Sequence, residues 1–165
     1  QGRLAEAMFE RERLVSGARN LLAGAAELKV PVLWTEQAPA KLGPTIPELV
    51  AMMPGARPIP KVAFSCMGEP EFVRQLRELG RSSVLLAGIE THVCVYQTAR
   101  DLLAAGYHVE VVGDAVSSRT ASNLRIGTER ILAEGARLTS VEMCLFELQR
   151  IAEGNIFRAI SRIVR

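Results

Sequence analysis

The chain has 165 residues, which is enough for one domain with a buried core. Hydrophobic residues make up 48% and charged residues 23%, as in a typical globular protein, and no apolar run is long enough to cross a bilayer. The net charge is only +2 with both signs mixed along the chain, so we expect no nucleic-acid and no membrane partner.

Short apolar runs alternate with segments of helical periodicity along the chain. The predicted helices cover residues 11–28, 69–79, 91–105, 121–134 and 141–152, with a shorter helix near 46–52 inside the loop 38–60. The predicted strands cover residues 30–35, 83–88, 109–112 and 137–139. An amphipathic tail at 156–165 is expected to dock on the domain or on a second subunit. This order predicts a single-domain three-layer α/β/α sandwich with a mostly parallel, Rossmann-like sheet.

In such folds the active site lies past the carboxyl ends of the strands, and the segment after Gly88 is therefore a candidate. There a strand turns into a helix, with Cys94 in its first turn. The helix dipole and unpaired backbone N–H groups favour the thiolate, so we expect a lowered pKa for Cys94 and an oxyanion-binding turn at Glu90, Thr91 and Val93. A small buried Cys that packs the helix on the sheet is the equal alternative.

The segment 88–95, GIETHVCV, resembles the cysteine motif of the isochorismatase-like hydrolase superfamily, and DAVSSR at 114–119 is also typical of it. The resemblance covers essentially the whole chain and indicates the superfamily, with no preference for a substrate. Because this superfamily works with a Cys, a Lys and an Asp, the resemblance implies Cys94 as nucleophile and Lys61 as its partner. A Lys beside a thiolate stabilises the negative charge.

The acid of that triad has no match in the chain. In the superfamily an Asp ends the first strand, in a segment of the form Asp-x-Gln, and Gln1 matches the Gln of that segment. We therefore expect the first strand and its Asp to lie upstream of Gln1. A chain that truly lacks this strand is the alternative, but it would expose the interior of the sheet. Asp101 is expected to be solvated, and Asp114 to tie down the turn around Ser117.

Four residues are expected near the substrate. Trp34 and Phe64 are placed to form an apolar wall, although each alone is also a reasonable core residue. Glu36 is expected to take part in the pocket or to order the following loop. His92 is expected to line the pocket or the surface rather than to act as a base, and Thr91 to cap the helix that carries Cys94.

The chain has few candidate metal ligands and no cysteine pattern that is typical of disulfides. It has three cysteines, two histidines, no CxxC and no Asp-x-His cluster of the kind that nicotinamidases use for a metal. We expect no metal and no cofactor, and we expect Cys66 and Cys144 to be reduced core thiols.

These features together predict a hydrolase that acts on an amide, another C–N bond or an isochorismate-like bond of a small molecule, through a covalent Cys intermediate. One alternative is a catalytically idle binding or interaction module on the same scaffold. Another is a redox-reactive thiol protein, although no resolving Cys is evident near Cys94 in the sequence. A homo-oligomer is expected because the tail and the loop 38–60 need cover. A cytoplasmic location is expected because the three sparse cysteines are typical of reduced thiols, and no signal-peptide pattern is present in the sequence.

Overall fold

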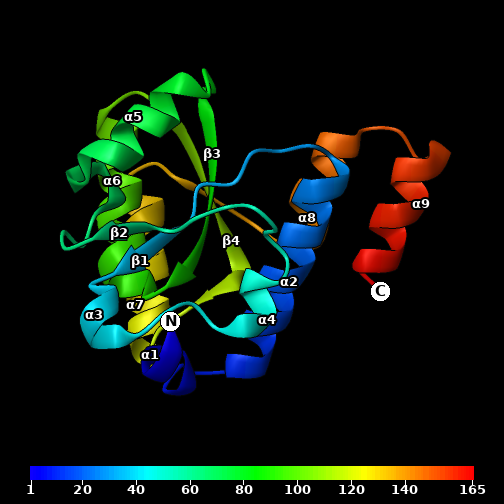
Figure 1. The fold of residues 1–165 in the computed structure, drawn as a ribbon. Helices are drawn as coiled ribbons and strands as arrows, with labels where there is room; N and C mark the ends of the chain where they lie inside the picture. The colour runs from blue at the N-terminus through cyan, green and yellow to red at the C-terminus, as the bar shows by residue number, and fades with distance from the viewer.

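The computed structural model describes residues 1–165 (Figure 1). The five strands are β1 (Thr35–Gln37), β2 (Ile59–Lys61), β3 (Ser83–Ile89), β4 (His108–Ser117) and β5 (Arg137–Thr139). The nine α-helices are α1 (Gly2–Glu6), α2 (Arg11–Glu27), α3 (Pro39–Leu42), α4 (Pro47–Val50), α5 (Pro70–Glu78), α6 (Tyr96–Ala104), α7 (Ala121–Ala133), α8 (Val141–Gln149) and α9 (Gly154–Ile163). None of these helices has the length and apolar character needed to cross a membrane.

The strands form two parallel sheets. One contains β1 and β2, and the other has the order β3-β4-β5. The predicted mixed α/β fold with parallel strands and flanking helices is confirmed, but its strands are divided between two sheets. β3 lies at the edge of its sheet, so one of its edges forms no ladder.

Two hydrophobic cores cover the two faces of the larger sheet, which makes the three layers (Figure 1). One core joins α5, α6 and α7 to β4 through side chains such as Leu76, Leu102 and Ile131. The other joins α2, α8 and α9 to β4, with Leu145 and Ile160 at its centre. Since neighbouring residues of β4 point to opposite faces, this one strand contributes to both cores, as a strand buried on both sides must.

Two strands differ in extent from the prediction. Residues 30–34 form no strand, because a ladder partner is available only from residue 35 onward, where β1 pairs with β2. β4 continues past the predicted end at residue 112 to Ser117, after an irregularity in its register with β3. The carboxyl end of β4 therefore reaches the same edge as the turn that carries Cys94.

The carboxylate of Asp114 does not hold the turn around Ser117, which corrects that expectation. It accepts the backbone N–H of Val141 at 2.9 and 3.2 Å, at the start of α8. A helix leaves its first N–H groups without partners, and a carboxylate there also meets the positive end of the helix dipole. Asp114 thus ties β4 to α8.

The tail docks on its own domain, which confirms one of the two expected alternatives. α9 contacts α2 and α8, and Ile160 is fully buried there. The ring of Phe157 lies 6.0 Å from that of Phe146, a separation at which aromatic pairs attract. Apolar side chains on and after α8 remain exposed, among them Met143, Leu148 and Ile151.

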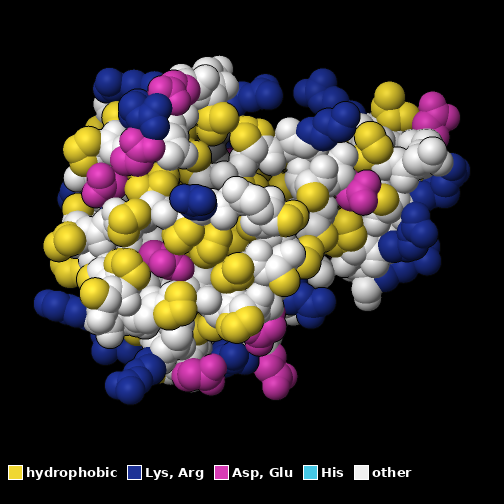
Figure 2. Space-filling view, viewed as in Figure 1, with side chains coloured by type: hydrophobic (Ala, Val, Ile, Leu, Met, Phe, Trp, Pro, Cys, Tyr) yellow, Lys and Arg dark blue, Asp and Glu magenta, His cyan; other side chains and the backbone are white.

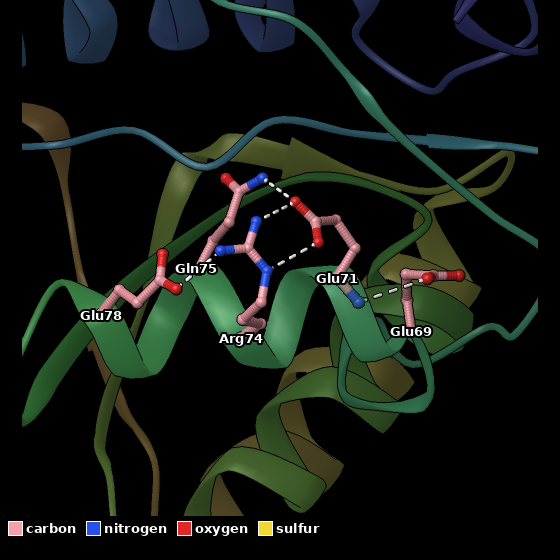
Figure 3. Close-up of polar contacts among 5 residues, drawn as sticks. All are labelled: Glu69, Glu71, Arg74, Gln75 and Glu78. Carbon is pink, nitrogen blue, oxygen red and sulfur yellow. Dashed lines mark hydrogen bonds and ion pairs between the residues drawn. The ribbon is translucent and has the colours of Figure 1, made fainter.

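Hydrophobic and charged side chains lie in different parts of the molecular surface. In the view of Figure 2, hydrophobic side chains gather across the middle of the face that carries β1, β2 and α4, and most Lys and Arg side chains lie around its rim. On α5, Arg74 bonds to Glu71 at 2.6 and 2.9 Å and to Glu78 at 2.6 Å (Figure 3). Glu69 caps the same helix by accepting the N–H of Glu71. These exposed pairs orient α5 side chains and add little to stability.

Candidate active site

A cavity of about 80 Å³ lies between the carboxyl ends of β1 and β3, where a parallel α/β fold is expected to bind ligands. Its lining comes from both sheets and from the start of α6: Gln1, Thr35, Gln37, Lys61, Cys66, Leu86, Ala87, Ile89, Cys94, Val95 and Thr98. The structure therefore brings the predicted nucleophile Cys94 and its predicted partner Lys61 to one small cavity, although they lie 33 positions apart in the sequence.

Cys94 belongs to a single π turn, Thr91–Val95, that connects β3 to α6. Burial raises the pKa of its thiol above the ordinary value, and the positive charge of Lys61 lowers it in part. Proximity to Cys66 raises this pKa further, while a backbone hydrogen bond at Glu90 lowers it. The expected lowered pKa is thus wrong in direction, because loss of water around the half-buried sulfur outweighs the stabilising groups.

Lys61 is 4% exposed and donates three hydrogen bonds. Its Nζ lies 2.5 Å from Oε1 of Gln37, 2.9 Å from the carbonyl oxygen of Ala63 and 2.8 Å from that of Phe64. An ammonium group has three hydrogens, so all of its donors are used, and all by neutral acceptors. None of the ion pairs of the protein involves Lys61. The cavity therefore contains a fixed positive charge that no carboxylate neutralises.

Gln37 is a site residue that the sequence reasoning missed. Its side chain accepts from Lys61 and donates to the carbonyl of Val62 at 2.7 Å. Its backbone is held by Gln1, whose amide accepts the Gln37 N–H at 2.5 Å and donates to the Gln37 carbonyl at 3.1 Å. The Gln1 side chain thus occupies the free edge of β1 as a neighbouring strand would. Gln37 directly follows Glu36, just after the end of the predicted strand, and this position was the available sequence signal.

Cys66 and Thr98 were also missed. The backbone N–H of Cys66 donates to Oγ1 of Thr98 at 2.9 Å, and its sulfur lies 3.6 Å from Oγ1 of Thr35. Thr98 follows Cys94 by four positions, which places the two on the same face of a helix, so this spacing was a usable signal. Cys66 has no such spacing to Cys94, and only the folded chain brings it to the cavity.

The three predicted oxyanion residues build the turn. The buried carboxylate of Glu90 accepts from the side chain of Arg119 at 3.0 Å. The hydroxyl of Thr91 donates to the carbonyl of Ser117 at 3.0 Å, so it does not cap the helix as expected. The N–H of Val93 donates to the carbonyl of Glu90 at 3.1 Å and is therefore already engaged. Contacts to the end of β4 thus fix the backbone around Cys94.

None of the four predicted pocket residues lines the cavity. Trp34 and Glu36 both bind Thr45: the indole N–H donates to its hydroxyl at 2.8 Å, and the carboxylate accepts its backbone N–H at 2.6 Å. They order the loop after β1, which is one of the two roles expected for Glu36. The side chain of Phe64 is exposed, and only its carbonyl reaches Lys61.

The side chain of His92 contacts the segment after β4 and does not line the cavity. Its Nδ1 lies 3.0 Å from the hydroxyl of Ser118. The backbone of His92 packs against Gly127 of α7, where an added Cβ would lie 2.7 Å from its N and Cα. Only glycine allows α7 to approach the turn this closely, so Gly127 supports the backbone that carries Cys94. The structure contains no group of three or more His, Cys, Asp or Glu side chains placed to hold a metal ion.

The chain is similar to known proteins over most of its length. The isochorismatase domain family matches residues 1–143. The chain belongs to the isochorismatase family. It is 41% identical over 162 residues to the secreted isochorismatase effector Isc1 of Phytophthora sojae, covering 95% of this chain and 77% of that protein. It is 42% identical over 156 residues to isochorismatase domain-containing protein 2A of Mus musculus, covering 93% and 73%.

Solved isochorismatase-like structures have the same fold. The MAR1 ribonuclease of Caenorhabditis elegans is 33% identical with a TM-score of 0.92, covering 99% of this chain and 84% of that one. YcaC of Pseudomonas aeruginosa, solved with hexane-2,5-diol and covalent acrylamide, is 25% identical with a TM-score of 0.93, covering 99% and 83%. YcaC of Escherichia coli, described as an octameric hydrolase of unknown specificity, is 25% identical with a TM-score of 0.87, covering 94% and 76%. Family membership supports a hydrolase.

Proposed function

We propose that the protein hydrolyses an amide, another C–N bond or an isochorismate-like bond of a small molecule, with Cys94 as nucleophile and Lys61 as its electrostatic partner. The observation that carries this proposal is their shared cavity, in which the charge of Lys61 lowers the pKa of the Cys94 thiol against the effect of burial. A neighbour solved with covalent acrylamide supports covalent chemistry in this fold.

The role of Lys61 follows from its hydrogen bonds. Because its three donors are all occupied, Lys61 contributes a fixed charge and does not carry the proton. For an amide substrate, the sulfur of Cys94 forms a bond to the carbonyl carbon, and its proton passes to a base. The carbon–nitrogen bond then breaks as the amine takes up that proton. Water attacks the resulting thioester and releases the acid and the free thiol.

We propose that the base is an Asp on a further strand between β1 and β3, outside residues 1–165. Both strands flank the cavity without a hydrogen-bonded ladder between them, and Gln1 already mimics strand pairing on the edge of β1. No carboxylate of the described chain forms an ion pair with Lys61. The sequence of the natural protein upstream of Gln1 tests this directly: an apolar run without an Asp there would contradict it and favour the idle binding module.

Turnover of a panel of small amides and an isochorismate-like enol ether tests the hydrolase, in the natural full-length protein and its Cys94→Ala variant. We expect acid quenching during amide turnover to leave an acyl adduct on Cys94, and the variant to lose at least about a thousandfold in rate. Full turnover in the variant would contradict the nucleophile assignment. Lys41→Met, a change at an exposed lysine, serves as the control for handling and folding.

A second candidate function comes from the neighbour described as a ribonuclease. The net charge of only +2, with both signs mixed along the chain, favours a small substrate over RNA. Release of soluble nucleotides from RNA by the wild-type protein, with none from the Cys94→Ala variant, would make RNA the better substrate for the same site.

We further propose self-association and a reducing location. Exposed apolar side chains on and after α8, such as Met143 and Ile151, and the octameric neighbour support an oligomer. Light scattering should give a mass above that of one chain, and a monomer mass at micromolar concentration would contradict this. Three free cysteines support a cytoplasmic location, whereas one relative is secreted. Cell fractionation decides between these locations.

A further inference from the structure

Two of the three cysteines share the cavity, although neither the sequence spacing nor the family assigns a role to the second one. Cys66 and Cys94 both line it, and both are partly exposed to solvent. The two thiols are close enough that Cys66 raises the pKa of the Cys94 thiol. Cys144 is different, because it is buried in the core on the opposite face of the larger sheet.

A tether holds Cys66 near the nucleophile. Its backbone N–H lies 2.9 Å from Oγ1 of Thr98, which is buried and follows Cys94 by four positions on the helical run. The backbone of Cys66 is therefore held next to the helical run that follows Cys94, and the two cysteines line the same small cavity.

The side chain of Cys66 packs against the hydrophobic core on one face of the larger sheet. Its sulfur has one polar contact, with Oγ1 of Thr35 at 3.6 Å, and Cys66 lies in a short 3₁₀ turn, Cys66–Gly68. A change of side-chain rotamer redirects such a sulfur without a change in the backbone.

We propose that Cys66 is a resolving cysteine that forms a reversible disulfide with Cys94 when the protein meets a hydroperoxide. The Cys94 thiolate attacks the peroxide, so that a sulfur–oxygen bond forms, the oxygen–oxygen bond breaks and an alcohol or water leaves. The Cys66 thiolate then attacks the resulting sulfenic acid. A sulfur–sulfur bond forms and water leaves, so one peroxide takes two electrons from the two thiols.

The disulfide would occupy the proposed nucleophile and protect it from irreversible oxidation, and a dithiol reductant would restore it. The formation of this bond does not depend on the proposed hydrolase activity. Only the accompanying loss of turnover rests on that function, so the two can fail separately.

Peptide mapping by mass spectrometry tests the proposal on the wild-type chain and on Cys66→Ser. Each protein is treated with hydrogen peroxide, its remaining thiols are alkylated, and half of each sample is first reduced with dithiothreitol. In the wild type we expect a peptide pair that joins Cys66 to Cys94 with loss of two hydrogen atoms, an unmodified Cys144, and recovery of both thiols on reduction. In Cys66→Ser we expect sulfinic and sulfonic acid on Cys94, which dithiothreitol does not reverse.

The proposal is overturned if wild-type Cys94 accumulates sulfinic acid as fast as the variant does, or if its disulfide joins Cys144 or a second chain. The wild-type map is decisive by itself, so a folding defect in Cys66→Ser would not remove the test. Cys66→Ala is the second variant, since alanine lacks the hydroxyl that serine would offer to Thr35.

Discussion

Replacing Lys61 by Met removes the buried ammonium from the cavity and keeps an unbranched side chain of similar length. The positive charge of Lys61 lowers the pKa of the Cys94 thiol, against the larger effect of burial. We therefore expect the pKa of Cys94, already raised by burial, to rise further in Lys61→Met. The carbonyl oxygens of Ala63 and Phe64 and the amide oxygen of Gln37 also lose their hydrogen-bond donor. Each of these acceptors that water does not reach lowers the stability of the protein by about 1–3 kcal/mol.

The assay is alkylation of Cys94 by iodoacetamide against pH, followed residue by residue by mass spectrometry. Each unit by which a thiol pKa rises lowers the thiolate fraction at neutral pH about tenfold, while the more basic thiolate is about threefold more nucleophilic. The alkylation rate at neutral pH should therefore fall in Lys61→Met, by about threefold for each unit of the rise. At high pH the order should reverse, because the thiolate is then fully formed in both proteins. Rate profiles that coincide at all pH values in folded protein would refute the electrostatic role of Lys61. Lys41→Met should match the wild type.

Two further predictions concern the support of the site and the surface of α5. Gly127→Ala should destabilise the protein by about 1–3 kcal/mol in urea unfolding, because the new Cβ would lie 2.7 Å from backbone atoms of the π turn. The same substitution should change the alkylation rate of Cys94. The control Ser122→Ala, on the exposed side of α7, should change neither the stability nor this rate. Hydrogen bonds from Arg74 hold the pKa of Glu71 at about 2, so its small contribution to stability is present above the ordinary pKa of 4.5 and is lost as pH falls toward 2. Thermal midpoints of wild type and Glu71→Gln should therefore converge near pH 2, and a difference that grows on acidification would contradict this assignment.

The pKa of the Cys94 thiol depends on opposing contributions that the local sequence does not determine. A turn at the start of a helix favours a thiolate, and that part of the reasoning used only neighbouring residues. In the folded chain the sulfur also loses water to side chains that come from β1, β2 and β3. The opposing contributions of burial and of Lys61 both come from residues remote in sequence, so the sign of the pKa shift is set by the tertiary structure.

The sequence alone determined the elements and their class. Alternating apolar runs and helical periodicity predicted the helices that became α2, α5, α6, α7 and α8, because these patterns are local and each element buries one face. It also placed Cys94 at a strand-to-helix turn, and the resemblance of two short motifs indicated the family and Lys61. Strand extent was less predictable, since residues 30–34 have the composition of a strand but lack a partner to pair with.

Only the tertiary structure decided which polar groups meet. Asp114 binds the start of α8, and His92 turns toward Ser118, because β4 continues five residues beyond its predicted end and brings new partners to the turn. Gln37 accepts a hydrogen bond from Lys61, and Cys66 lines the same cavity as Cys94, although no spacing in the sequence encodes either arrangement. Hydrogen-bond partners and charges are selected by distance in space, and parallel strands bring their carboxyl ends together from positions far apart in the chain.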